Sequence, residues 1–187
     1  MGAAKSRARQ QIFHDLSYVV VVPATADINI AYAQSTAEIL GADHAFIDYQ
    51  DLFPFVASVL VVTPHNLHRE MGVRSLQAGK HVLMEKPMAI SEPECLDLID
   101  TATRSSKTLM TAYPMHYQPL VVKLKELIDA EYLGKVFHIG IFTEQLTEPL
   151  LGHWMRSAKH LGGGQFFSHG WSKREQVMPL YLSIRVR

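Results

Sequence analysis

Two hydrophobic periods alternate along the first two thirds of the chain. Short, nearly continuous apolar runs predict buried β-strands. These runs cover residues 18–22, which continue toward Asp27, and residues 46–47, 59–62, 81–84 and 109–112. Between them, residues 30–40, residues 67–78 and the segment that begins at Ser91 carry helically spaced apolar positions. Strands and helices that alternate in this way predict an α/β fold with a mostly parallel sheet and right-handed connections.

The pattern changes after about residue 115. Residues 119–130 predict another helix, and residues 136–142 alternate apolar and polar positions like a sheet strand. A helix is also expected over residues 4–16, ahead of the first strand. We therefore expect a first domain over residues 1–115 and part of a second α/β domain over residues 116–187.

Several residues mark where the predicted helices begin and end. Gly41 and Gly79 are expected to stop the helices before them, because glycine readily takes the left-handed conformation. Ser91, with Glu94 three residues later, has the spacing of a capping box. Asp27 admits two roles, which can hold together: it caps the helix that follows, or it binds a ligand at the end of its strand.

Composition narrows the class of protein. The chain has 187 residues, of which 48% are hydrophobic and 19% charged, so it can bury a core. Eighteen basic and eighteen acidic side chains balance, which gives no sign of nucleic-acid binding. The single cysteine, Cys95, fits a reducing compartment, so we expect a cytoplasmic protein. No apolar stretch approaches the ~20 residues of a membrane span. The N-myristoylation pattern at Gly2 is loose, so we expect no membrane partner.

Two polar clusters follow neighbouring predicted strands. Residues 63–68 read Thr-Pro-His-Asn-Leu-His between a strand and a helix, and Glu85, Lys86 and Pro87 follow the next strand. The carboxyl ends of parallel strands meet at one edge of a sheet, where open α/β sheets bind ligands. We therefore expect both clusters to line one pocket. A lysine there can accept the proton while a nicotinamide cofactor takes a hydride.

Further candidate residues give weaker signals. Trp154 and Arg156, followed by glycines at 162–164, could line a polar substrate pocket. His65 and His68 offer two metal ligands three residues apart, but no carboxylate or cysteine cluster joins them, so we expect no metal site. Tyr113 and His116 either reach the substrate or pack within a loop.

Residues 59–87, VLVVTPHNLHREMGVRSLQAGKHVLMEKP, closely resemble the Gfo/Idh/MocA oxidoreductases. The resemblance extends over about residues 19–170, with several spaced motifs in the family's order. It implies a Rossmann-like dinucleotide-binding domain, residues 1–115, joined to an α/β substrate domain from residue 116. It also implies NAD or NADP as the cofactor and a small sugar-like or diol substrate, whose hydroxyl/carbonyl pair is oxidised or reduced.

The resemblance assigns roles to individual residues. Lys86, in the signature tripeptide Glu85-Lys86-Pro87, is assigned to catalysis and cofactor contact. Asp27 matches the acid that binds the adenosine ribose, which favours NAD over NADP, and Trp154 with Arg156 matches a pair that orients the substrate. The loop along the nicotinamide half of the cofactor is matched by Thr63, Pro64, Asn66 and His68.

Two motifs of the family are missing from the sequence. The G-x-G-x-x-G turn is absent, and Gly2 stands where its last part would lie, so we expect the sequence to start inside the first βα unit. Ser168 and Ser172 stand where a D-x-x-x-H element has its acid and histidine. We therefore expect impaired turnover. The alternative is a non-catalytic interaction protein that pairs an open sheet edge with a full-length relative. Whether the chain forms a homo-oligomer stays open.

Overall fold

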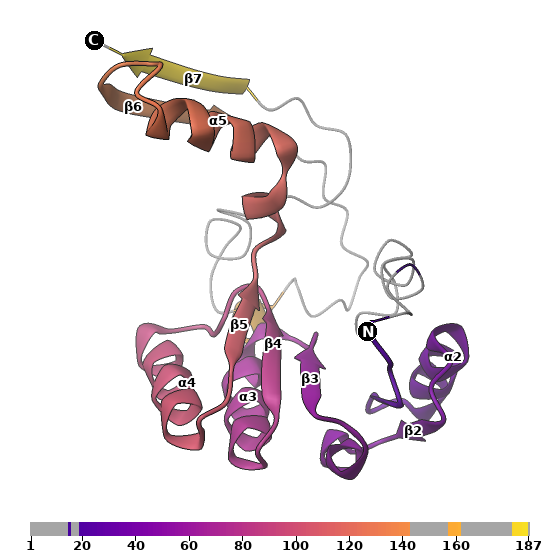
Figure 1. Cartoon of the computed structure of the whole chain (residues 1–187). Coiled ribbons are helices and arrows are strands. Elements are labelled where there is room, and N and C mark those ends of the chain that lie inside the picture. Colours follow the sequence, from indigo (N-terminus) through magenta and orange to yellow (C-terminus); the bar gives the residue numbers. More distant parts are fainter. Residues whose placement is uncertain (1–14, 16–18, 143–156, 162–180, 187) are drawn as a thin grey trace.

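The structure is a computed structural model that describes residues 15, 19–142, 157–161 and 181–186 (Figure 1). The helix expected over residues 4–16 and the glycines at 162–164 lie outside this part of the chain, Asp15 apart. The described elements confirm the predicted α/β class with parallel strands.

A first, two-stranded parallel sheet consists of β1 (Ala24–Ala26) and β2 (His44–Phe46), joined by helix α2 (Ile30–Leu40). Asn29 caps α2: its side-chain oxygen accepts a hydrogen bond from the N–H of Ala31 at 3.0 Å. Gly41 ends the helix in the left-handed conformation, with φ at 68°. Asp27 accepts from the N–H of Asn29 at 2.8 Å, so it supports the turn before the helix, and the cap expected at Asp27 is wrong.

The strand expected at residues 18–22 begins later than the valine run predicts. Among the described residues, 19–22 belong to no strand, and Val19 and Val21 are 65% and 81% exposed. Pairing begins at Pro23, whose carbonyl oxygen accepts from the N–H groups of Asp43 and His44. Valine favours extended backbone, but a strand extends only as far as its partner, and β2 has three residues.

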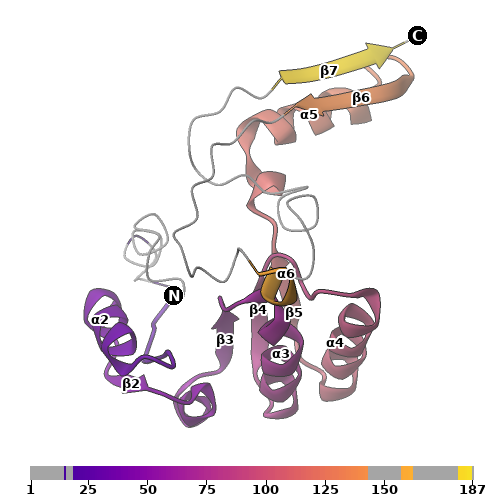
Figure 2. The same cartoon turned by 180° about the vertical axis from the view of Figure 1, so that it is seen from behind.

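A second sheet holds three parallel strands in the order β3 (Ser58–Val61), β4 (His81–Glu85) and β5 (Leu109–Ala112). The crossover helices are α3 (His68–Gln77) and α4 (Glu92–Ser105), which pack against each other; Figure 2 shows α3 in front of β4. Val61, Met84 and Leu98 are buried in the core that these elements share. The opposite face of the sheet presents a row of partly exposed side chains in register, Leu60, Leu83 and Met110.

The start of α4 fits a capping box only in part. Ser91 occupies the cap position, but its side chain makes no capping bond. Glu94 does reach back, yet it accepts from the N–H of Ile90 at 3.2 Å, one residue before the expected donor.

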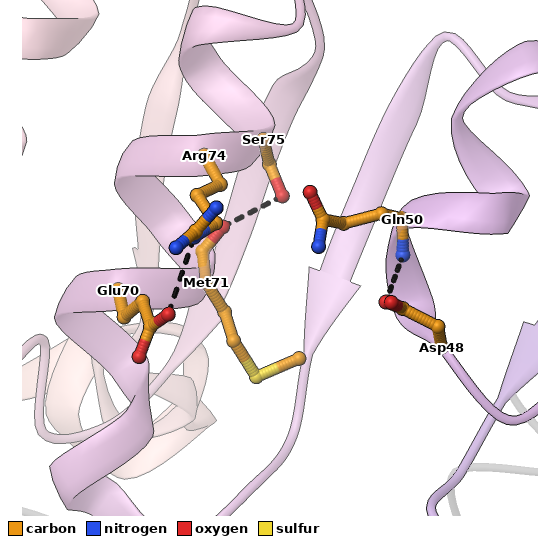
Figure 3. Close-up of polar contacts among 6 residues, drawn as sticks. All are labelled: Asp48, Gln50, Glu70, Met71, Arg74 and Ser75. Atoms are coloured by element: carbon orange, nitrogen blue, oxygen red, sulfur yellow. Dashed lines mark hydrogen bonds and ion pairs between the residues drawn. The ribbon is translucent and has the colours of Figure 1, made fainter.

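The 3₁₀ helix η2 (Tyr49–Phe55) links the two sheets, and its Leu52 shares one core with Ala24 of β1 and Val59 of β3. Figure 3 shows the side chain of Gln50 pointing from η2 toward α3. Local hydrogen bonds hold the two facing segments: Gln50 N–H to Asp48 at 2.9 Å, Arg74 to Glu70 at 3.2 Å, and the Ser75 hydroxyl to the Met71 carbonyl at 2.8 Å.

After β5, the chain continues through η4 (Pro114–Tyr117) into α5 (Pro119–Asp129) and β6 (Val136–Phe142), close to the predicted bounds. Strand β7 (Tyr181–Val186), which was not predicted, pairs antiparallel with β6. The short α6 (Ala158–Leu161) packs against η3 (His65–Leu67). Within the described part of the chain, no helix is long and apolar enough to cross a membrane.

Candidate active site

The carboxyl ends of β3, β4 and β5 lie side by side. The three strands are parallel and in register, with Val61 opposite Met84 and Met84 opposite Thr111. The loops that leave these strands therefore share one edge of the sheet (Figure 1). This is the edge on which the polar clusters at residues 63–68 and 85–87 were expected to meet.

His68 connects the two clusters directly. It is the first residue of α3, and its side chain has no exposed surface. Its Nδ1 lies 2.8 Å from the carbonyl oxygen of Pro87, and its Nε2 lies 3.0 Å from the carbonyl oxygen of Thr63. Both ring nitrogens face backbone of the strand-end loops, so His68 can influence a bound molecule through these loops.

Burial lowers the pKa of His68 below its ordinary value. The hydrogen bonds to Pro87 and Thr63 and the nearby charge of Glu85 act in the opposite direction, but burial is the largest cause. The neutral ring is therefore favoured near neutral pH.

The rest of the 63–68 loop offers one polar atom in need of a partner. The side-chain oxygen of Asn66 is buried and accepts no hydrogen bond within the part of the chain that the structure describes. A buried acceptor of this kind is normally satisfied by water or by a ligand. The Thr63 hydroxyl donates to the sulfur of Met71 at 3.5 Å, which holds the loop against α3.

Glu85, Lys86 and Pro87 continue β4 into the loop at the same edge, and all three are half-buried. The Lys86 N–H donates to a carboxylate oxygen of Glu85 at 3.2 Å, and the Lys86–Pro87 peptide bond is cis. The loop that carries the candidate catalytic amine thus has its backbone held at two points: Glu85 at Lys86, and His68 at Pro87.

Tyr113 follows β5 at the same edge, and its ring stacks on that of His116 with centroids 6.0 Å apart. Burial, with a smaller contribution from Cys95, raises the pKa of the Tyr113 hydroxyl. Thr111, which lies on β5 before Tyr113, has a buried hydroxyl with no hydrogen-bond partner among the described residues. Sequence reasoning did not single out Thr111, because a lone threonine in a strand carries no signal.

The structure groups most of the expected site residues but not all of them. Asp27 follows β1 in the other sheet, where it is half-buried. Trp154 and Arg156 lie outside the described residues. The residues that meet at the edge of the second sheet are Thr63, Pro64, Asn66, His68, Glu85, Lys86 and Pro87.

Within the described residues, no group of three or more histidine, cysteine, aspartate or glutamate side chains is placed to hold a metal ion. His65 and His68 lie near each other, with ring centroids 5.5 Å apart, but the two nitrogens of His68 already face carbonyl oxygens.

A parallel sheet with crossover helices and polar loops at its carboxyl edge is typical of α/β proteins of the Rossmann type. The model of the Gfo/Idh/MocA family, described as an oxidoreductase family with an NAD-binding Rossmann fold, matches residues 1–113. This is more than half of the chain, so the chain belongs to that family.

Individual relatives agree with this assignment. The chain is 31% identical over 151 residues to trans-1,2-dihydrobenzene-1,2-diol dehydrogenase of Danio rerio, covering 80% of this chain and 44% of the relative. It is 32% identical over 120 residues to an inositol 2-dehydrogenase/D-chiro-inositol 3-dehydrogenase of Lactiplantibacillus plantarum, covering 62% and 34%. An NAD-binding oxidoreductase structure from Klebsiella pneumoniae superposes with a TM-score of 0.72 at 29% identity, covering 88% and 45%. The chain spans less than half the length of these relatives.

Proposed function

We propose that the carboxyl edge of β3, β4 and β5 holds the nicotinamide half of NAD or NADP. We further propose that Lys86 exchanges a proton with a sugar-like or diol substrate there. The observation that carries this proposal is the pair of contacts from His68 to Thr63 and Pro87, because they bring the two candidate loops together at one side chain. Relatives named as diol and inositol dehydrogenases support the substrate class.

The residues present fit such a coenzyme. The unpartnered oxygen of Asn66 can accept a hydrogen bond from it, and the half-buried loops at residues 63–64 and 85–87 offer backbone and side-chain contacts. Asp27, at the end of β1, would hold ribose hydroxyls and favour NAD. When bound, the coenzyme would supply hydride transfer to and from the substrate carbon.

Lys86 would accept or donate the proton that accompanies this hydride transfer. In oxidation, the substrate C–H bond breaks, the carbon–oxygen double bond forms, and the hydroxyl proton passes to the unprotonated Nζ of Lys86. In reduction, the same amine returns the proton to the carbonyl oxygen. The Glu85 carboxylate accepts from the Lys86 N–H, and the His68 ring contacts the Pro87 carbonyl oxygen, so both would position the backbone around Lys86. Trp154 with Arg156 would orient the substrate.

Three further parts of the proposal concern the chain as a whole. We propose a boundary between a dinucleotide-binding and a substrate domain near residue 115, where η4 separates β5 from α5. We also propose weak turnover for these 187 residues, because the sequence contains no G-x-G-x-x-G motif to bind the pyrophosphate. A cytoplasmic location is proposed from the single cysteine, Cys95.

Binding and turnover test the proposal separately. NADH and NADPH are titrated against the chain by fluorescence, and turnover is followed at 340 nm, the absorbance band of the reduced nicotinamide, over a panel of sugars, inositols and diols. Lys86→Met should lower kcat by about 10²-fold or more while coenzyme binding weakens much less. Lys107→Met, at the opposite end of the sheet just before β5, is the matched control and should retain wild-type kcat.

Unchanged kcat in Lys86→Met would contradict the catalytic role. Failure of the wild-type chain to bind either coenzyme at millimolar concentration would contradict the binding site. High turnover that depends on Lys86 would refute the proposed weak activity and leave the catalytic role intact.

The sheet edges favour a second candidate function, a non-catalytic interaction protein. Among the described residues, β1 pairs only with β2 and β3 pairs only with β4, so each has one edge without a ladder. Such edges accept strands of other chains. Size-exclusion chromatography with a full-length relative should then show a mixed complex, and separate elution of the two proteins would exclude this role.

A further inference from the structure

The contacts of His68 require more protons than a neutral imidazole holds. Carbonyl oxygens only accept hydrogen bonds, so each ring nitrogen must carry an N–H to bond the oxygen that it faces. Nδ1 faces Pro87 at 2.8 Å and Nε2 faces Thr63 at 3.0 Å. A neutral ring has one N–H, and only the imidazolium form bonds both oxygens.

The neutral ring therefore leaves one of the two carbonyl oxygens opposite a nitrogen lone pair. Thr63 and Pro87 are half-buried, so water can reach that oxygen in the free protein. A molecule bound across both loops would exclude this water, and an unsatisfied buried carbonyl would then destabilise the complex. Taking up a second proton removes this penalty.

We propose that His68 is a positioning residue of the site: in its doubly protonated form it ties the loops of Thr63 and Pro87 together, and coenzyme binding draws the second proton onto its ring. This proposal rests on the proposed function, because the coenzyme is the molecule that spans the two loops. Both ring nitrogens of His68 face backbone carbonyl oxygens, so its effect on the bound molecule passes through Thr63 and Pro87.

The charged groups around the ring permit this proton uptake. The carboxylate of Glu85 on β4 favours the imidazolium form. His65 on η3 is the nearest titratable ring. Arg69, next along α3, donates to the Asp97 carboxylate on α4 at 2.7 Å, so its charge is compensated. Lys86 precedes Pro87 in the loop that His68 contacts, and its positive charge opposes the uptake. Among the described residues, α6, which packs on η3, also carries Lys159 and His160.

Calorimetry measures the proposed proton uptake. NADH is titrated into the whole chain at pH 6.5 in two buffers with different heats of ionisation, and the difference in binding heat gives the number of protons taken up. Wild type should take up a proton fraction well above zero, and His68→Gln should take up none. His44→Gln replaces an exposed histidine on β2 and should behave as wild type. The NADH dissociation constant should also decrease by about three- to tenfold from pH 8 to pH 6 in wild type and His44→Gln, but not in His68→Gln.

A second measurement needs neither coenzyme nor a variant. Nitrogen NMR of ¹⁵N-histidine-labelled protein should show both ring nitrogens of His68 protonated and slow to exchange in acid, and one protonated at higher pH. A His68 ring N–H proton that exchanges freely with water in acid would contradict the proposed link between the two loops.

The two measurements separate the possible failures. Equal proton uptake in wild type and His68→Gln overturns the coupling to coenzyme. If wild type binds no NADH, the proposed function and the coupling both fail, while two protected ring N–H groups still establish the tie between the loops.

Discussion

Gly72 of α3 lies directly against Leu98 of α4. A Cβ on Gly72 would come within 2.6 Å of the Leu98 Cδ2 and 2.8 Å of the Met84 Cε, and both of those side chains are fully buried. The missing side chain allows α3 to approach α4 and β4 closely. His68, one helical turn before Gly72, is thereby held at the strand ends.

Gly72→Ala should destabilise the chain. Overpacking a filled core costs about 1–3 kcal/mol, whereas alanine gains about 1 kcal/mol over glycine in a helix. Both neighbouring side-chain ends must shift within a buried core, so we expect a net loss of up to about 2 kcal/mol. The urea midpoint of unfolding measures it.

A double-mutant cycle supplies the control. Leu98→Ala alone should cost about 2–5 kcal/mol by leaving a cavity. In that background Gly72→Ala has room and should become neutral or stabilising. An equal cost of Gly72→Ala in both backgrounds would show that the contact with Leu98 is not its cause.

The exposed ion pair between α3 and α4 should contribute little to the stability of the fold. Arg69 and Asp97 have side chains 48% and 32% exposed. Asp97→Asn should therefore cost less than about 1 kcal/mol, and the loss should shrink in 1 M salt. A larger, salt-independent loss in urea unfolding would mean that Asp97 has a structural role beyond this pair.

The lowered pKa of His68 should make stability depend on pH. Between its ordinary value near 6.5 and its lower folded value, the unfolded chain binds more protons than the folded chain. The contribution of His68 to the free energy of unfolding should thus be fully present above about pH 6.5. It should decrease as the pH falls through this window, by at most about 1.4 kcal/mol per pH unit.

Urea unfolding at several pH values between 5 and 8 checks the sign. His68→Gln should lose this part of the pH dependence, whereas His44→Gln should retain it. A wild-type stability that increases on acidification relative to His68→Gln would contradict the lowered pKa.

Substitutions at Asp27 and Asn29 should distinguish a role in NAD binding from a role in stability. Asp27→Asn keeps an oxygen that can accept from the Asn29 N–H, so stability should change by less than about 0.5 kcal/mol while NAD binding weakens by about tenfold. Asn29→Ala removes the cap of α2 and should cost about 1 kcal/mol with little effect on NAD affinity in the folded chain. Equal effects of both changes on NAD affinity would remove Asp27 from the site.

Local sequence patterns predicted the elements that depend on local rules. The bounds of α2, β5 and β6 agree with the expected ones, because apolar spacing and the glycine at residue 41 specify them within a few residues. The prediction of a strand over residues 19–22 failed because strand length depends on the partner strand, which the composition of these residues does not reveal.

The site was predictable at the level of loops but less so at the level of contacts. Strand order places residues 63–68 beside residues 85–87, as the alternating pattern predicted. The roles of the carbonyl oxygens of Thr63 and Pro87 could not be foreseen, since every residue carries the same backbone group. The direct cofactor contact expected of His68 stays a prediction, and the structure adds a route through the loops.

The division into two sheets has a consequence for how the chain opens. Among the described strands, no backbone ladder joins β1 to β3, and Leu52 of η2 bridges them by apolar packing. Cooperative units separated in this way can unfold one at a time. The amide protons of β1 and β2 should thus exchange with deuterium through a lower-energy opening than those of β4, which has a partner on both sides.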